Sequence, residues 1–395
     1  MNVSVSNKSE AVESFLSGKL AQVDVKKIEA ELSKLWTQAA VSDSEEDHPQ
    51  VIRACSSNLI LYTDREDAES SDGNILDEIV LAHPSRAILA ICREAASRKL
   101  EAWVTARCHL ASGSGSKQIC SEQITVLAEG EIENELISVI ESLLLGDLPV
   151  FLWWTTADLC GEKLGPFLSC CRRLVVDSSR APYSFQFLRD LQQIVESTES
   201  CVAVSDLNWR RLLGIRAAIA EEFERSPLSI AGLQDIKTLR ISSCGQELQE
   251  DDCSLQSLLL TGWLADRLSW EACSFSKDKS NLSTARFKNT KNEREITVEF
   301  KSTAMAHVAP GSIYEIEIEL LSGEKLRISR DPAGEVGSLV VLVKKGESKI
   351  RELLADDSDL DRVHLMGYEI EELAVDTVFA GALEAAVKLL HLLEA

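Results

Sequence analysis

The sequence predicts an α/β protein in which a mixed-sheet N-terminal α/β domain precedes an α+β domain with antiparallel strands and a C-terminal helix. In the first half, short apolar or β-branched runs alternate with stretches of helical periodicity. Beyond residue 285, apolar and polar residues alternate, as in half-buried antiparallel strands. The 395 residues, 45% of them hydrophobic, can form two cores of ordinary size. We expect a helical segment and linker over 1–50, an α/β domain over 51–184 and an α+β domain over 185–395.

In the first half, one or two short helices are predicted over 13–37, and the acidic stretch 41–50 is predicted to be a linker. A helix after residue 73 should stop near His83, because the residue before a proline resists the helical conformation. A further helix is predicted over 132–145. The predicted strands are 57–62, 86–92, 102–110, 118–127, 150–155 and 174–176.

In the second half, helices are predicted over 185–197, 206–223 and 255–268, with a strand over 238–242. Antiparallel strands are expected around Phe287, over 296–300, over 314–320 and over 326–328, with Ser322-Gly323 as a hairpin turn. The apolar face of a terminal helix over 376–394 should pack on this sheet.

The charge balance argues against several classes of partner. There are 64 acidic and 41 basic residues, a formal net charge of -23, which repels nucleic acid and anionic membrane surfaces. The N-terminus lacks the basic start and apolar core of a signal peptide. The richest apolar run, 136–154, contains Glu141 and Asp147, which argues against a membrane-spanning segment. Eleven cysteines without a secretion signal suggest a reducing compartment and mostly free thiols. We therefore expect a cytoplasmic protein that contacts neither nucleic acid nor membrane.

The stretch from Asp206 to Phe223 has the character of a protein-recognition helix. Ser205 or Asp206 can cap it, and its apolar residues recur at helical spacing. Trp and Arg often anchor interfaces, and these residue types are expected around the rim of the helix. The predicted partner-binding residues are Trp209, Arg210, Arg211 and Arg216. The alternative is an ordinary surface helix with internal salt bridges to Glu221 and Glu222.

This stretch resembles the OpcA family, the assembly proteins of glucose-6-phosphate dehydrogenase. The resemblance extends through residues 83–86 (HPSR), 148–154 (LPVFLWW) and 262–270 (GWLADRLSW), and so covers most of the chain after residue 75. No one of these motifs is a chemical signature, so the match rests on their order and joint presence. The resemblance implies a non-enzymatic factor that binds glucose-6-phosphate dehydrogenase and favours its active oligomer. It also implies thiol control, with thioredoxin as a further partner.

Local motifs for chemistry are absent from the sequence. It contains neither a glycine-rich phosphate-binding pattern nor the H-E-x-x-H, G-x-S-x-G or C-x-x-C motifs. The six histidines include no pair at three- or four-residue spacing. We therefore predict no catalytic residue, no metal site and no cofactor, although a dispersed active site would leave no local motif.

His83 and Arg86 form the one candidate ligand pocket. His83 could act as an acid or base at the mouth of the sheet, but a helix C-terminal cap before proline is the favoured interpretation. Arg86 could equally hold a carbonyl or acid within the protein or a substrate phosphate. An alternative function follows: a sensor or enzyme that binds a sugar phosphate in the crevice at the strand ends of the first domain.

Two further residue pairs, one of cysteines and one of tryptophans, lead to structural predictions. Cys108 and Cys120 lie equidistant from Ser114, so a symmetric hairpin would place them face to face as a disulfide and a candidate redox pair. The favoured alternative is two unpaired thiols in slightly different register, because loops of this length often contain bulges. For Trp153 and Trp154, core packing is favoured over ligand stacking, since their strand should be central.

Overall fold

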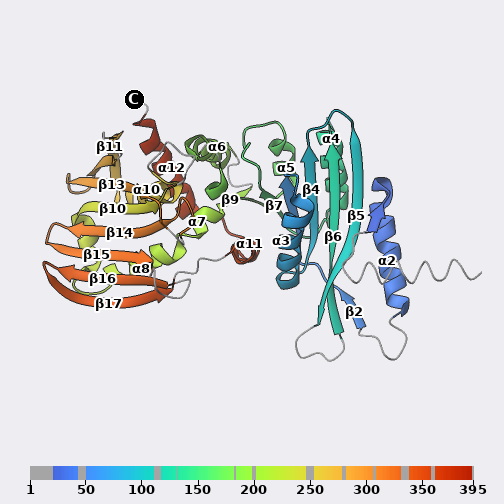
Figure 1. Ribbon diagram of the computed structural model, residues 1–395, viewed down its shortest axis with the longest axis horizontal. Helices are drawn as coiled ribbons and strands as arrows, with labels where there is room; N and C mark the ends of the chain where they lie inside the picture. The colour runs from blue at the N-terminus through green and yellow to red at the C-terminus, as the bar shows by residue number, and fades with distance from the viewer. Residues whose placement is uncertain are drawn as a thin grey trace, which may run out of the picture. The chain divides into compact units, whose positions relative to one another are not determined.

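The computed structural model describes residues 21–42, 50–110, 117–130, 132–181, 184–197, 202–245, 253–277, 282–305, 308–330, 338–356 and 361–393. The chain divides into two units, each with its own sheet (Figure 1). Unit 1 lies within Met1–Val176, Ser200–Val204 and Arg362–Ala374, and unit 2 within Asp177–Glu199, Ser205–Asp361 and Val375–Ala395. Residues 362–374 thus belong to unit 1, a return of the chain for which the sequence contains no signal.

The first sheet has a parallel centre. Its strands are β1 (Ala21–Val23), β2 (Gln50–Arg53), β3 (Ser57–Thr63), β4 (Ser85–Arg93), β5 (Lys99–Leu110), β6 (Lys117–Glu129), β7 (Val150–Trp154), β8 (Arg173–Val176) and β9 (Ala203–Asp206). They follow the order β1-β5-β6-β4-β3-β7-β8-β9, with β2 paired to β6. The pairs β6–β4, β4–β3, β3–β7 and β7–β8 are parallel, whereas β5 is antiparallel to β1 and β6.

The central strands are apolar runs because both faces of a parallel sheet are covered. Every residue of β3 and β7 is buried, and Trp153 and Trp154 each expose 1% of their surface. Core packing of both tryptophans, the favoured prediction, agrees with this placement. The mixed sheet confirms the predicted fold class of the first half.

The helices of unit 1 are α2 (Ile28–Ser42), α3 (Ala68–Ala82), α4 (Glu133–Leu143), α5 (Leu164–Cys170) and α11 (Arg362–Glu371), with a short 3-10 turn at Val25–Lys27. The α3 helix ends at the predicted place, where the backbone N–H of His83 donates to the carbonyl of Ile79 (2.7 Å). The sequence does not predict α5 and α11. Helix α11 packs against α3.

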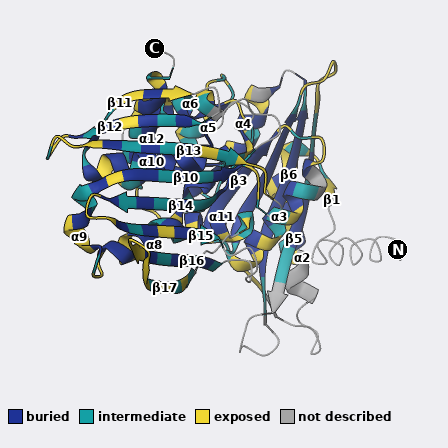
Figure 2. Ribbon diagram, turned by 60° about the vertical axis from the view of Figure 1, so that its left-hand side comes forward, coloured by how far each residue is buried: buried dark blue, intermediate teal, exposed yellow. Residues whose placement is uncertain are grey.

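The second sheet is largely antiparallel, as predicted. Its strands are β10 (Ile236–Cys244), β11 (Trp270–Lys277), β12 (Ser283–Asn289), β13 (Glu295–Thr303), β14 (Ile313–Leu320), β15 (Glu324–Arg330), β16 (Ser338–Lys345) and β17 (Ser348–Asp356). They follow the order β11-β12-β13-β10-β14-β15-β16-β17, and only β10 and β13 pair in parallel among these described strands. Figure 2 shows buried and more exposed residues alternating along them. Gly323 has a φ of 89°, which allows the tight turn between β14 and β15.

The helices of unit 2 are α6 (Ser184–Ser197), α7 (Leu207–Arg210), α8 (Leu213–Phe223), α9 (Ser229–Gly232), α10 (Leu255–Leu268) and α12 (Thr377–His391), with 3-10 turns at Ser178–Arg180 and Leu233–Asp235. Helix α12 packs on α10, α6 and β11, which agrees with the expected contact between the terminal helix and this sheet. A Cβ atom on Gly262 of α10 would lie 2.1 Å from the carbonyl oxygen of Ala382 in α12. The Gly262 position therefore sets how closely the two helices approach.

We expect Gly262→Ala to destabilise unit 2 by about 3 kcal/mol, because the added methyl group must push a backbone carbonyl aside. Chemical unfolding followed by a unit 2 signal would measure the loss. Gly165→Ala in α5 of unit 1, followed by a unit 1 signal, is the control, since nothing lies within 4 Å of its Cβ position. That change should be neutral or stabilising, because alanine favours a helix over glycine. Equal effects of the two substitutions would contradict the close-approach argument.

Candidate functional site

The predicted recognition helix 206–223 is interrupted, which corrects the expectation of one continuous helix. Helix α7 ends at Arg210 and α8 begins at Leu213. At the break, the backbone N–H of Leu212 donates to the carbonyl of Trp209 (3.1 Å), which tightens the chain and allows both side chains to be buried. Asp206 caps α7 by accepting from the N–H of Asn208, as the sequence predicts.

Trp209 lies in the interior of unit 2 and not on the rim where it was expected. It exposes 3% of its surface, its indole Nε1 donates to Asp376 Oδ2 (2.9 Å), and its ring packs on Phe379. The guanidinium of Arg216 lies over the same ring, 3.6 Å from its centroid. Burial lowers the pKa of Arg216 to about 10, which still leaves it charged at neutral pH.

Arg211 is also committed to an internal contact. Its guanidinium donates twice to Asp177, with NH1 at 2.7 Å and NH2 at 2.9 Å from the two carboxylate oxygens. Burial raises the pKa of Asp177, but the hydrogen bond and charge of Arg211 outweigh burial and hold it below its usual value. The sequence could not identify this pair, because Asp177 lies 34 residues upstream.

What α8 does present to solvent is a narrow face with small residues at its centre. We call this the α8 outer face, and it consists of Leu213, Ala217, Ala220, Glu221 and Glu224. Arg210 and Arg216 are partly exposed. The alternative interpretation of this helix predicts internal salt bridges to Glu221 and Glu222. Both glutamates do form salt bridges, but with Arg225, which was not among the predicted residues. Contact of this segment with a partner stays a prediction.

A buried polar network begins at Asp206. Its carboxylate accepts from the backbone N–H of Ser178 (2.9 Å), the hydroxyl of Ser178 (2.6 Å) and the backbone N–H of Asn208 (2.9 Å). Asn208 accepts from Gln256 (2.9 Å), whose side-chain oxygen accepts from the backbone N–H of Ile313 (3.0 Å). The network joins segments that are far apart in the sequence of unit 2, so it fixes where α7 begins.

Arg86 is placed inside unit 1, in a setting different from the predicted crevice. It lies at the amino end of β4 and exposes 1% of its surface. Its Nε donates to Glu122 Oε2 (2.8 Å), and NH1 donates to the carbonyl of Leu143 (2.6 Å) and to Glu29. Burial lowers its pKa, but the charges of Glu122 and Glu29 outweigh burial and raise it. Of the two predicted roles, the geometry supports the internal one.

His83 follows the end of α3, as the favoured cap interpretation requires. Its side chain is 22% exposed, and Nδ1 lies 3.8 Å from Glu371 Oε1. A Cβ atom on Gly367 of α11 would lie 2.6 Å from His83 Nε2, so the imidazole fills the space next to that glycine. This geometry gives His83 a packing role between α3 and α11.

Cys108 and Cys120 form a disulfide. They are directly opposed in the β5–β6 register, with a Cα–Cα separation of 4.1 Å. The favoured alternative of two unpaired thiols in shifted register is therefore wrong. The turn at residues 111–116, around Ser114, lies outside the described residues. Cys120 is buried and Cys108 is partly exposed, so an attacking thiol would reach Cys108 first.

The turn between β3 and α3 does not fit the pyrophosphate of a dinucleotide. Sheets of this type that bind dinucleotides place a glycine-rich turn there, with the phosphates at the helix N-terminus. This turn instead carries the exposed acids Asp64, Glu66 and Asp67. Its one cation, Arg65, donates to Asp67 at 2.9 and 3.0 Å. The acids would repel phosphate, and the glycines that admit it are missing.

Within the residues that the structure describes, no cluster of three or more His, Cys, Asp or Glu side chains could hold a metal ion. No helix in the same part of the chain is both long enough and apolar enough to cross a bilayer.

Two family models match this chain in order. The first is described as the glucose-6-phosphate dehydrogenase subunit N-terminal domain and matches residues 76–193. The second is described as the C-terminal domain of that subunit and matches residues 202–383. Together the matches cover well over half of the chain and include α7, α8 and the Asp206 network.

Relatives of known name agree with these matches. A protein of Nostoc punctiforme, provisionally named OxPP cycle protein OpcA, is 31% identical over 243 residues, 60% of this chain and 50% of that protein. Its namesake in Synechocystis is 30% identical over 206 residues, 51% of this chain and 41% of that protein. The matched part thus spans about half the length of these relatives or less.

Among solved structures, levoglucosan dehydrogenase in complex with NADH aligns with 87% of this chain and 96% of its own. The identity is 11% and the TM-score 0.46. A similarity this distant says nothing about the chemistry of this chain. The ordered pair of domain matches does decide the family, and the chain belongs to the OpcA family.

Proposed function

We propose that this protein binds glucose-6-phosphate dehydrogenase as a non-enzymatic partner and favours the active oligomer of that enzyme. The observation that carries the proposal is the pair of family matches, in order, to the two domains of a glucose-6-phosphate dehydrogenase subunit. The acidic β3–α3 turn supports a role without dinucleotide chemistry. The names of the relatives place those proteins in the OxPP cycle, and we propose the same pathway here.

The proposed mechanism is thermodynamic linkage. A partner that binds one oligomeric or conformational state more tightly shifts the population toward that state by its differential affinity. The dehydrogenase would then bind substrate better without any new group entering its active site. This mechanism needs only a surface that discriminates between two states of the enzyme.

We propose the α8 outer face, with Arg210 and Arg216 beside it, as part of the surface that meets the dehydrogenase. Ala217 and Ala220 are exposed and small, so a partner element can approach the helix closely. Leu213 is 44% exposed and supplies an apolar contact. Trp209 contributes indirectly, because its ring supports the guanidinium of Arg216.

We also propose that thiols control this interaction, with thioredoxin as the reductant. The Cys108–Cys120 disulfide links two neighbouring strands of the first sheet, and Cys108 is partly exposed. A thiolate that attacks Cys108 sulfur would form a mixed disulfide and release the thiolate of Cys120. A second thiol of the reductant would then release Cys108, which leaves both cysteines reduced.

The test is to mix the purified chain with its cognate dehydrogenase and to measure activity at low substrate concentration. We expect stimulation by the unchanged chain, with a different extent in oxidised and reduced samples. A chain carrying Cys108→Ser and Cys120→Ser should stimulate equally under both conditions. Absence of stimulation in every redox state would refute the assembly function.

Leu213→Asp tests the surface when the dehydrogenase is titrated with the chain and the affinity of the complex is measured. We expect it to weaken the complex at least tenfold, because it puts a charge into an apolar contact. The fold should survive, since an acid is favourable in the first turn of a helix. Ile230→Asp is the control, because Ile230 is 68% exposed on a different helix of unit 2. Equal binding by the two variants would place the contact elsewhere.

A further inference from the structure

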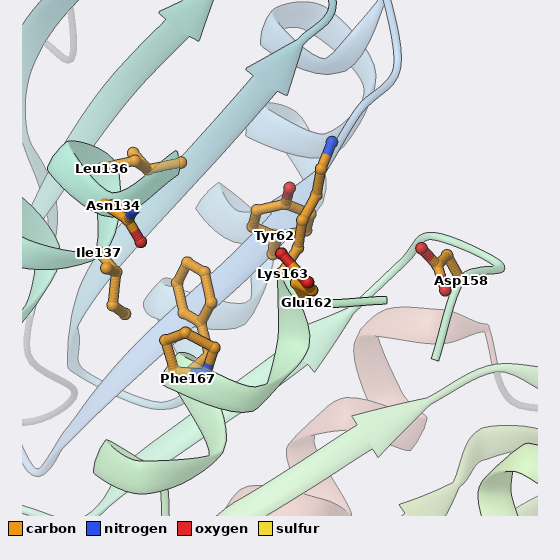
Figure 3. A pocket seen from close by; sticks show the side chains of 9 residues that line it. Tyr62, Asn134, Leu136, Ile137, Asp158, Glu162, Lys163 and Phe167 are labelled. Atoms are coloured by element: carbon orange, nitrogen blue, oxygen red, sulfur yellow. The ribbon is translucent and has the colours of Figure 1, made fainter. Parts of the chain in front are cut away.

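Unit 1 contains a cavity of about 290 Å³ that none of the predicted site residues lines (Figure 3). Tyr62 and Phe167 form its aromatic wall, and Leu136, Ile137 and Pro166 add apolar surface. Its polar lining consists of Asn134, Asp158, Glu162 and Lys163. Three segments contribute these residues: the end of β3, the first turns of α4, and the segment that runs from the β7–α5 connection into the first turn of α5.

The position of the cavity in the sheet favours a ligand site. Strand β3 lies between β4 and β7, all three are parallel, and β4 and β7 follow it in opposite directions across the sheet. Tyr62 and Asp158 lie at or beyond the carboxyl ends of β3 and β7. Open α/β sheets bind ligands outside the carboxyl ends of the strands where the strand order reverses. The cavity occupies that place, whereas Arg86 lies at the opposite end of β4.

The aromatic wall is held rigidly. The ring of Tyr62 stacks on Trp154 with centroids 4.0 Å apart and planes 6° apart. Phe167 meets both rings edge-on, at 5.2 and 5.8 Å. The indole Nε1 of Trp154 donates to the carbonyl of Asp158 (3.0 Å), which ties the polar loop to the aromatic cluster. These contacts hold the wall in place, so binding need not order it.

The polar lining selects against phosphate. Asp158 and Glu162 supply two carboxylates against the single ammonium of Lys163. One oxygen of Asp158 accepts from the backbone N–H of Gly161 (2.7 Å), which fixes the carboxylate and leaves its second oxygen as an acceptor. Carboxylates accept hydrogen bonds from hydroxyl groups and repel anions.

We propose that this cavity binds a neutral polyhydroxylated ring, a free sugar or a cyclic polyol. Its volume is at the lower end of the roughly 300–1,000 Å³ usual for small-molecule sites, so it admits a single ring and not a dinucleotide. The C–H face of such a ring packs on Tyr62 and Phe167, and its hydroxyl groups donate to Asp158 and Glu162. The amide of Asn134 and the ammonium of Lys163 donate to its oxygen atoms.

The test uses the full chain without any dehydrogenase, so its result is independent of the proposed assembly function. Saturation-transfer NMR would be recorded with glucose and myo-inositol and, in parallel, with glucose 6-phosphate and NADP⁺. We expect transfer to at least one neutral ring, and affinities at least tenfold weaker for the two phosphorylated compounds. Tighter binding of either phosphorylated compound, or no transfer to either neutral ring, would overturn the proposal.

Asn134→Tyr is the blocking variant, because Asn134 is exposed on α4 and its replacement can fill the cavity without entering the core. We expect at least a tenfold loss of affinity for the neutral ring. Ser142→Tyr, an exposed position further along α4, is the matched control and should bind as the unchanged chain does. Glu162→Gln should weaken binding as well, since it removes a charged acceptor. Unchanged binding by Asn134→Tyr would place the ligand elsewhere and refute the site.

Discussion

Arg173→Met should destabilise unit 1 by about 3–5 kcal/mol, because it removes the guanidinium that pairs with the buried carboxylate of Glu369. Arg173 and Glu369 expose 1% and 2% of their side chains and lie 3.1 Å apart. The same guanidinium donates to the carbonyls of Glu372 (2.6 Å) and Ala374 (2.7 Å). One side chain of β8 thus holds α11 and the residues that follow it.

The measurement is hydrogen exchange of peptides from β7, β8 and α11, together with urea unfolding. We expect α11 to lose protection first, because its buried carboxylate and two carbonyls lose their donor. Adding Glu369→Leu to Arg173→Met should recover much of the loss, since an apolar pair often replaces a buried ion pair at little cost. Glu371→Gln is the control on α11, where the side chain is 65% exposed and a small effect is expected. If Arg173→Met lowers the free energy of unfolding by less than about 1 kcal/mol, Arg173 does not hold α11 in place as argued.

The contact of Arg173 with Glu369 also shows which part of the fold the sequence does not predict. The strands β3, β4 and β7 are apolar runs bounded by turns, so local pattern was enough to place them. The period-two strands of unit 2 were likewise visible, apart from β11, β16 and β17. Nothing in residues 362–374 marks them as part of unit 1, since Arg173 and Glu369 are 196 positions apart. Pairings over such distances depend on tertiary contacts that no local pattern encodes.

The candidate sites show the same difference between local geometry, which the sequence reveals, and long-range contacts, which it does not. The cap at Asp206 follows from short-range geometry and occurs in the structure. The symmetric hairpin that places Cys108 opposite Cys120 also occurs, although unpaired thiols in a shifted register were the favoured interpretation, because the sequence does not show whether the loop contains a bulge. The sequence predicts Trp209 on the rim of the helix, because Trp often anchors interfaces and residue type alone does not reveal burial. The hydrogen-bond acceptor that makes its burial possible, Asp376, lies 167 positions away. The cavity at Tyr62 left no motif at all, since its lining comes from three separate segments.

The free energy of unfolding of unit 2 should fall as pH rises from about 4 to 7, by up to about 3 kcal/mol from Asp206 alone. Burial raises the pKa of Asp206 to about 6 from an ordinary value of 3.8, against the opposing effect of its hydrogen bonds to Ser178. Between these values the folded state keeps the proton that the unfolded state has released. The unfolded state then binds fewer protons, so stability decreases with rising pH and levels off above the folded pKa.

Asp206→Asn isolates this contribution. The amide oxygen can still accept from the backbone N–H groups of Ser178 and Asn208, and the amide nitrogen can donate to the Ser178 hydroxyl. The variant should therefore fold and should lack most of the decline between pH 4 and 7. Denaturant unfolding at several pH values measures this decline. A variant that keeps the full slope would assign it to other groups.

Asp177 provides a control of opposite sign next to the same residue. Burial raises its pKa, but Arg211 lowers it further, so the net pKa lies below 3.8. Its contribution to stability is present above the unfolded pKa and is lost only as pH falls through the folded value. Asp177→Asn should therefore lower stability throughout pH 4 to 7, because Arg211 loses its bidentate partner. It should reduce the decline in that range without abolishing it, because the charge of Asp177 contributes to the raised pKa of Asp206, and burial contributes more. Two carboxylates that are adjacent to Ser178 and Ser179 thus respond to pH in opposite directions, because Asp177 faces the guanidinium of Arg211, whereas Asp206 is buried among neutral donors and near the charge of Asp177.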